Sequence, residues 1–269
     1  MDFGLIVIGD EILSGKRQDK HFARVVELLG ERGLQLAWAR YLGDDRARIG
    51  AALREAFAGS DAVFCCGGIG ATPDDHTRQA AAAALGVPLA LHPQARELIV
   101  ERMREVAAEQ GLVFDPDRAD NVHRLNMGVF PEGAQLIPNP YNKIPGFRCA
   151  GSGGGALHFV PGFPVMAHPM IAWVLDHEYA ALHGRDRQVE HSVVVYGAME
   201  AALTPLMEAI EAQHAGVRVF SLPSVDHPQH GRHIELGVKG AAAAVGPAYA
   251  ALRAGLASEG ARLGPEMVR

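Results

Sequence analysis

The sequence predicts an α/β protein with a mostly parallel sheet flanked by helices, followed by a small α+β sandwich domain. Strand and helix signals alternate from residue 3 to about residue 86, which is typical of a parallel sheet with helices on both faces. From about residue 189 the order becomes strand, helix, strand, strand, helix, which fits a small two-layer sandwich. A polar run at residues 183–188 marks the boundary, so we expect domains at residues 1–183 and 188–269.

Three short apolar runs of the first domain have the character of buried strands, and a loop with glycine and aspartate follows each of them. The runs cover residues 3–8, 36–41 and 61–66. Because the carboxyl ends of parallel strands open on one edge of a sheet, we expect these loops to lie together there. The other expected elements are helices at 46–57, 93–110 and 164–183, a helix ending near 126, and strands at 135–137 and 157–160; the second domain adds strands at 191–196, 217–222 and 233–239 and helices at 199–214 and 242–258.

The loop at residues 66–77 has the composition of a phosphate-binding loop. Gly67, Gly68 and Gly70 let the backbone approach an anion closely and turn its N–H groups toward it, and a helix follows with its positive N-terminal end. Asp74 and Asp75 would repel a bare phosphate, so they either cap the helix or hold a divalent cation that bridges to the phosphate. The residues alone leave both interpretations open.

The two preceding loops carry further candidate residues. Gly9, Asp10, Glu11 and Gly15 follow the first strand, and Asp44 follows the second. Any one of these aspartates is most simply a helix cap. Three such junctions in the first third of the chain favour a shared ligand site.

These loops form a series of motifs that resembles the competence/damage-inducible protein A family. The N-terminal module of that family is a molybdopterin-binding-like domain, shared with molybdopterin adenylyltransferases and with the N-terminal part of eukaryotic FAD synthases. Ala71 stands where the family usually has proline, and residues 18–20 look more like the adenylyltransferase and FAD synthase versions. The motifs lie at residues 9–15, 43–45, 67–70, at Thr72, Asp74, Asp75 and Thr77, and at residues 131–134, 138–140, 145–147 and 161–164.

The resemblance covers residues 1 to about 180 and implies a set of site residues. In it the amides of residues 67–70 hold a phosphate, and Asp10, Asp44 and Asp75 hold a divalent cation, with Asp44 and Asp75 as the catalytic pair. The expected ligand-binding residues are Gly9, Asp10, Glu11, Gly15, Gly67, Gly68, Gly70, Thr72, Asp74 and Asn139. For Asn139, simple turn chemistry in a proline-rich loop is an equal alternative.

The resemblance favours metal-dependent hydrolysis of a nucleotide pyrophosphate such as ADP-ribose or FAD, with Mg²⁺, Mn²⁺ or Co²⁺ as the cofactor. The alternative is adenylyl transfer or pterin binding in molybdenum cofactor biosynthesis, with molybdopterin as the ligand. A second alternative is a non-catalytic binding scaffold. The small domain also resembles its counterpart in the family, which often ends in an amidase acting on pyridine nucleotides. No segment of that length follows here, so we do not expect deamidase activity.

Composition and charge exclude several classes of protein. The net charge of −6 argues against a broad face for nucleic acid. No apolar stretch is long enough to cross a bilayer, and the N-terminus runs directly into a strand, so we expect a cytoplasmic protein. The cysteines Cys65, Cys66 and Cys149 do not suggest a disulfide framework. From the family we expect a homo-oligomer.

Two further motifs are interpreted as structural. His227, His230 and His233 have a spacing that could bind a transition metal, but they fall on a predicted hairpin loop, and no acidic cluster or cysteine accompanies them, which favours an exposed polar loop. The glycine-rich run at residues 151–155 lies between predicted strands and no lysine follows it, so we expect a hairpin turn and no phosphate site.

Overall fold

The computed structural model describes residues 1–184 and 188–269, and the chain divides into two units, Met1–His183 and Gly184–Arg269. Residues 185–187, which belong to the predicted polar boundary, lie outside the described residues. Each unit is considered by itself.

The first unit is built on a six-stranded sheet with the order β2-β1-β3-β8-β7-β6. The strands β2, β1, β3 and β8 run parallel to one another. β7 is antiparallel to both of its neighbours, β8 and β6. β1, β3 and β8 are buried at every position, as expected for strands of a sheet covered on both faces. The strands are β1 (Phe3–Ile8), β2 (Leu36–Leu42), β3 (Ala62–Cys66), β6 (Gln135–Ile137), β7 (Gly146–Ala150) and β8 (Ala156–Val160).

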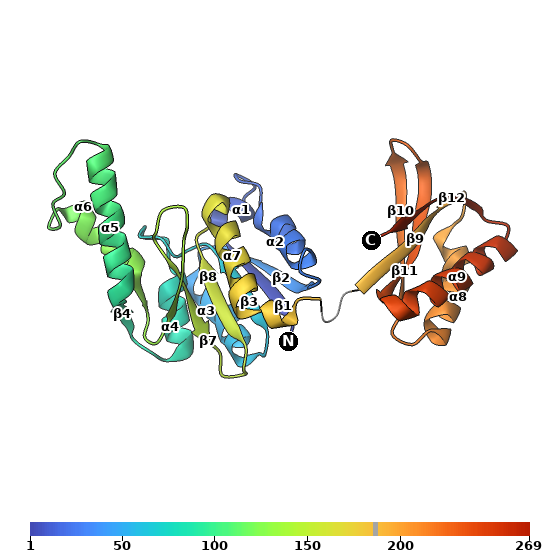
Figure 1. The fold of residues 1–269 in the computed structure, drawn as a ribbon, viewed down its shortest axis with the longest axis horizontal. Coiled ribbons are helices and arrows are strands. Elements are labelled where there is room, and N and C mark those ends of the chain that lie inside the picture. Colours follow the sequence, from blue (N-terminus) through green and yellow to red (C-terminus); the bar gives the residue numbers. More distant parts are fainter. Residues whose placement is uncertain (185–187) are drawn as a thin grey trace. The chain divides into compact units, whose positions relative to one another are not determined.

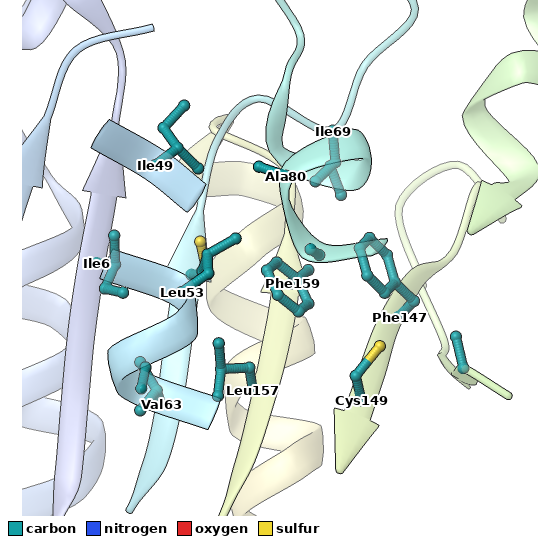
Figure 2. Packing of buried hydrophobic residues seen from close by; sticks show 14 of the residues in the cluster. Ile6, Ile49, Leu53, Val63, Ile69, Ala80, Phe147, Cys149, Leu157 and Phe159 are labelled. Atoms are coloured by element: carbon teal, nitrogen blue, oxygen red, sulfur yellow. The ribbon is translucent and has the colours of Figure 1, made fainter. Parts of the chain in front are cut away.

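Helices cover both faces of this sheet, and each face has its own hydrophobic core (Figure 1). On one face Ile49 and Leu53 pack with Leu157 and Phe159, and Phe147 stacks on Phe159 with ring centroids 4.4 Å apart (Figure 2). The other face is covered by α2 and α7. The helices are α1 (Asp10–Leu13), α2 (His21–Gly30), α3 (Arg46–Ala58), α4 (Thr77–Leu85) and α7 (Pro164–Glu178), the last followed by a 3-10 turn at Ala180–Leu182. The predicted parallel α/β architecture is confirmed.

Between α4 and β6 the chain makes an excursion away from the sheet. β4 (Leu89–Leu91) and β5 (Val129–Pro131) form a small antiparallel ladder at its base. The excursion itself consists of α5 (Pro93–Glu109), α6 (Ala119–Arg124) and a 3-10 turn (Leu125–Gly128). Figure 1 shows α5 and α6 in green, projecting beyond α4.

The second unit is an antiparallel sheet with two helices packed on it, which confirms the predicted small α+β domain. Its strand order is β10-β11-β9-β12. Val193, Leu236, Val245 and Leu252 belong to its fully buried core. The elements are β9 (Gln188–Tyr196), α8 (Glu200–Gln213), β10 (Arg218–His227), β11 (Gly231–Ala241), α9 (Ala242–Ser258) and β12 (Arg262–Val268).

Four strands were absent from the sequence prediction. β4 and β5 are only three residues long, and β7 and β12 contain glycine or proline, which normally interrupt strands. β7 begins at Gly146, directly after a proline, and it is β7, not the strand at 135–137, that leads into the 151–155 turn. Gly146 is required there because a Cβ atom would lie 2.3 Å from the carbonyl oxygen of Phe159. β12 contains Gly264 and Pro265, and its register with β9 shifts between Leu263 and Glu266.

Candidate functional site

Four loops meet at the carboxyl edge of the parallel strands. Ile8 pairs with Leu42, and Cys66 pairs with Val160, so the loops that follow β1, β2, β3 and β8 start side by side. They border a cavity of about 490 Å³. The predicted residues that line it are Gly9, Glu11, Asp44, Gly67, Gly68, Gly70, Thr72, Asp74, Asp75 and Asn139.

The segment at residues 67–72 is called the glycine loop below. At two of its positions, Gly67 and Gly68, the backbone accommodates only glycine. Gly67 has φ 110°, and a Cβ atom there would lie 2.2 Å from the carbonyl oxygen of Ile8. Gly68 has φ 68°, and its Cβ would lie 2.2 Å from Oγ1 of Thr77. Both positions combine a left-handed conformation with close approach, so the glycines set the path of the loop.

The backbone N–H groups of the glycine loop divide into engaged and free ones. The Gly67 N–H donates to the carbonyl of Val160 at 3.1 Å, and the Thr72 N–H donates to Oδ2 of Asp75 at 2.8 Å. Within the described part of the chain, the N–H groups of residues 68–71 have no hydrogen-bond partner. Four consecutive free amides beside a cavity can receive an anion. Of the amides predicted at residues 67–70, that of Gly67 is engaged, and Ala71 adds a free one beyond the predicted range.

Asp75 closes the glycine loop. Its Oδ2 accepts hydrogen bonds from the Thr72 N–H and, at 2.5 Å, from the Thr72 hydroxyl. His76 is the N-cap residue of α4 and makes no side-chain cap bond. Asp75 thus stabilises the loop rather than capping the helix, while Asp74 is exposed at the rim of the cavity.

Asp10 and Asp44 hold the first two loops together by reciprocal bonds. The Asp10 N–H donates to Oδ2 of Asp44 at 2.9 Å, and the Asp44 N–H donates to Oδ1 of Asp10 at 3.2 Å. Partial burial raises the pKa of Asp44, and the negative charges of Asp10, Glu11 and Asp74 add to this rise. Asp10 and Gly15 do not themselves line the cavity.

The three aspartates predicted to hold a cation do not form a metal centre. In residues 1–184 and 188–269, no three His, Cys, Asp or Glu side chains are grouped so that they could hold a metal ion. The carboxylates are used elsewhere: Asp75 bonds to Thr72 in its own loop, and Asp10 and Asp44 each accept from the backbone of the other's loop. The protein side chains present do not fit a metal site built from these three residues.

Asn139 is 4% exposed and uses its side chain inside its own loop. It donates to Oδ1 of Asn142 at 2.8 Å and to the carbonyl of Ile144 at 2.9 Å, and it accepts from the N–H of Tyr141. Turn chemistry therefore accounts for its polar atoms, and Asn139 shapes the cavity wall. On the same loop Lys143 adopts φ 65° and binds Glu101 and Glu105 of α5.

Some lining residues were not singled out in the sequence. Arg17 supplies a cationic side chain to the cavity. It follows Gly15 by two residues in a loop with glycines, and this position could have predicted it as a lining residue. Long apolar side chains from distant segments had no such signal, namely Met127, Ile144 and Met166, while Phe163 lies in the 161–164 motif. An adjoining cavity of about 330 Å³ shares Arg17 and Glu11 with the first and contains the buried His21, whose pKa is lowered by burial.

The remaining motifs of the sequence are not among the residues that line this cavity. The rings of His227 and His230 lie 4.9 Å apart and that of His233 5.2 Å from His227, but the described residues contain no complete three-ligand metal group. His233 lies in β11, in agreement with the predicted strand at 233–239, but it is 7% exposed, so the expected exposed position is wrong for this residue. All three cysteines are buried and free.

Comparison with known families identifies the class of the first unit. A family profile described as "Probable molybdopterin binding domain" matches residues 4–181. This is well over half of the chain, so the chain belongs to this family.

The chain is also similar to particular proteins. A CinA-like protein of Anaeromyxobacter dehalogenans strain 2CP-C is 33% identical over 221 residues, which cover 81% of this chain and 51% of the relative. A CinA-like protein of Geobacter metallireducens is 31% identical over 233 residues, with the same two coverages. The structure of the protein CinA from Thermoplasma acidophilum, described as having unknown function, matches with a TM-score of 0.55 and 28% identity, over 65% of this chain and 98% of that chain.

These matches confirm the predicted resemblance to the competence/damage-inducible protein A family. The chain spans about half the length of the curated relatives that it matches. None of the helices among the described residues is both long and apolar enough to cross a membrane.

Proposed function

We propose that the cavity binds a small molecule carrying a phosphate group, of the class represented by the pterin phosphate molybdopterin. The family to which residues 4–181 belong is described by molybdopterin binding, which supports this ligand class. The cavity volume of about 490 Å³ is in the range of small-molecule sites, roughly 300 to 1,000 Å³. Adenylyl transfer to such a phosphate is the reaction expected if ATP shares the cavity.

The observation that carries this proposal is the row of free amides at residues 68–71. Backbone N–H groups are strong donors, and most of those inside a folded protein are paired. Four neighbouring ones that face a cavity gain their partners when a phosphate binds. Arg17 borders the same cavity and is a further candidate for contact with the anion or the rest of the ligand.

Metal-dependent hydrolysis of a nucleotide pyrophosphate, such as ADP-ribose or FAD, is the second candidate. One observation favours it: the carboxylates of Glu11, Asp44 and Asp74 border the same cavity as the free amides. These charges repel a bare phosphate, and Mg²⁺, Mn²⁺ or Co²⁺ carried in with a pyrophosphate would reduce that repulsion. In this case Asp44 and Asp75 remain the proposed catalytic residues. The described residues of the protein alone offer no complete metal group.

Calorimetric titration separates the candidates. We would titrate the protein with 6-hydroxymethylpterin phosphate, ADP-ribose, FAD and ATP, with and without each cation, and assay ADP-ribose and FAD for AMP release. Binding of the pterin phosphate that inorganic phosphate competes away supports the first candidate. AMP release that requires a cation, without pterin binding, supports the second. Failure of every phosphorylated probe to bind would overturn both and favour a non-catalytic scaffold. Sedimentation of the same samples tests the proposed homo-oligomer.

A further inference from the structure

The glycine loop is held from the side that faces away from its free amides. Four of its carbonyl oxygens, those of Gly67, Gly68, Gly70 and Ala71, accept hydrogen bonds from residues outside the loop. The Gly70 carbonyl accepts from Nη2 of Arg78 at 2.5 Å, and the Ala71 carbonyl accepts from Nε2 of His123 at 2.7 Å. Thr77 holds two more, since its hydroxyl donates to the Gly67 carbonyl and its N–H to the Gly68 carbonyl, both at 3.0 Å.

These bonds fix where the amides point. In a trans peptide unit the C=O and the following N–H point in opposite directions, and the structure contains no cis bond in its described residues. A carbonyl of Gly70 drawn toward Arg78 therefore directs the N–H of Ala71 away from Arg78. In the same way Thr77 directs the N–H groups of Gly68 and Ile69.

Arg78 and His123 border a different cavity from the one that would hold the ligand. This second cavity, of about 350 Å³, lies on the far side of the glycine loop, and Ala71, Thr72 and Asp75 line both. Arg78 and His123 line only the second of these two. They act on the ligand site through the loop.

Arg78 adds a buried positive charge behind the loop. It is 4% exposed, and its guanidinium donates to main-chain carbonyls, with Val129 at 3.5 Å in addition to Gly70. Its Nε is buried and has no partner within the described residues. Arginine stays protonated in proteins, so this charge persists and favours an anion at the amides in front of it.

We propose that Arg78 and His123 are positioning residues that set the anion affinity of the glycine loop from its far side. The inference rests on the proposed phosphate site and adds to it that α6, a helix of the excursion, controls this site through one hydrogen bond. The loop dipoles and the Arg78 charge act in the same direction, so both favour the dianion of a phosphate over its monoanion.

Calorimetry with inorganic phosphate and ADP-ribose tests the inference on five variants of the full chain. Arg78→Met removes both charge and donors, and we expect at least a tenfold loss of affinity. Arg78→Lys keeps the charge but cannot reach two carbonyls, and we expect an intermediate loss. His123 is exposed, so His123→Leu and His123→Gln leave the fold intact. We expect about a fivefold loss for leucine and recovery to within twofold for glutamine, whose amide can donate to Ala71. Arg124→Gln on the same helix is the control and binds as the wild type.

The outcomes are distinguishable. A wild type that binds neither probe removes the proposed site and this inference with it. A wild type that binds, with both Arg78 variants and both His123 variants equal to it, overturns the inference alone. Should Arg78→Met not fold, the leucine and glutamine variants of His123 decide the question. Amide ¹H–¹⁵N spectra give a readout that a merely structural role would not move. The Ala71 amide follows the Gly70 carbonyl that Arg78 holds, so its phosphate-induced shift should shrink in Arg78→Lys and stay as in the wild type in Arg124→Gln. His123 holds the Ala71 carbonyl and so orients the Thr72 amide, whose shift should change in His123→Leu and return in His123→Gln.

Discussion

Two glycine-rich segments of the first unit have similar composition and opposite chemistry. The glycine loop leaves the N–H groups of residues 68–71 free beside a cavity. In the 151–155 turn, by contrast, the N–H groups of Gly151, Gly153 and Gly155 are bonded to carbonyls of Gly155, Phe57 and Gly59.

The two segments show that glycine has two different structural roles in this unit: close packing of the backbone and a left-handed backbone conformation. In the 151–155 turn it allows close packing, since a Cβ atom on Gly153 would lie 2.1 Å from the carbonyl oxygen of Ala58. In the glycine loop it allows a left-handed path that exposes donors. Composition alone cannot separate a packing glycine from a binding glycine. The state of the N–H groups can.

The largest effect on stability is expected for Gly153→Ala. Its Cβ would meet backbone oxygens of Ala58 and Gly59 at 2.1 and 2.4 Å, and backbone cannot move aside as a side chain can. We expect the free energy of unfolding in urea to fall by about 3 kcal/mol, with phosphate affinity unchanged in the folded protein. Gly154→Ala is the control, because it meets no atom within 4 Å and suffers only from φ 88°. Equal losses for the two variants would contradict the packing role.

Gly70→Ala is expected to have the opposite effects, with a small loss of stability and a large loss of phosphate affinity. Its φ is not positive, and its Cβ would meet Oδ2 of Asp75 at 2.5 Å, a side-chain atom that can shift. We expect less than about 1 kcal/mol of lost stability and at least a tenfold weaker affinity for phosphate, because the loop is displaced at its free amides. Gly246→Ala, in the open interior of α9, controls for the exchange itself. Undiminished phosphate binding by Gly70→Ala would show that the anion lies elsewhere.

Asp75→Asn separates the charge of this residue from its bonds. The asparagine oxygen can still accept from Thr72, so the loop should persist and stability should fall by about 1 kcal/mol at most. With the negative charge removed, we expect inorganic phosphate to bind a few-fold more tightly in calorimetry. If the second candidate function holds, AMP release from ADP-ribose should disappear in the same variant. Retention of full turnover would leave Asp75 with a structural role only.

The smallest effect is expected from Asp44→Asn and depends on pH. The pKa of Asp44 is raised in the folded protein, so the folded state binds a proton more readily than the unfolded state. Its contribution to stability is thus present at low pH and is lost as pH rises from about 3.8 through the raised pKa. Asp44→Asn should then gain a few tenths of a kcal/mol at pH 7 and nothing at pH 3, since the residue is largely exposed to screening. Thermal unfolding at both pH values measures this, and a loss at pH 7 would contradict it.

Much of the first unit was predictable because its signals are local. Apolar runs such as residues 3–8 and 61–66 form fully buried parallel strands, and the loops after them meet at one edge as expected. The engaged amides at Gly67 and Thr72 were not predictable, because their partners Val160 and Asp75 depend on strand pairing and on loop closure.

The same limit applies to residues that act across long stretches of sequence. His123 reaches the carbonyl of Ala71 from 52 residues away, on a helix with no motif of its own. Arg78 follows the glycine loop closely in sequence and lies in the first turn of α4. An arginine in a helix is normally exposed at the surface, so the sequence offered no reason to expect a buried one. Its burial follows from packing against β5. Sequence patterns indicated the loop that carries the N–H donors. The residues that orient this loop, Arg78 and His123, could be identified only from the fold.

The bonds behind the glycine loop also bear on the speed of recognition. With the carbonyls of Gly67, Gly68, Gly70 and Ala71 already held, little of this backbone remains to be ordered when a ligand arrives. A preformed site loses little conformational entropy on binding. Association should therefore proceed in one kinetic phase without a slow rearrangement, and related phosphates should differ mainly in how long they stay bound.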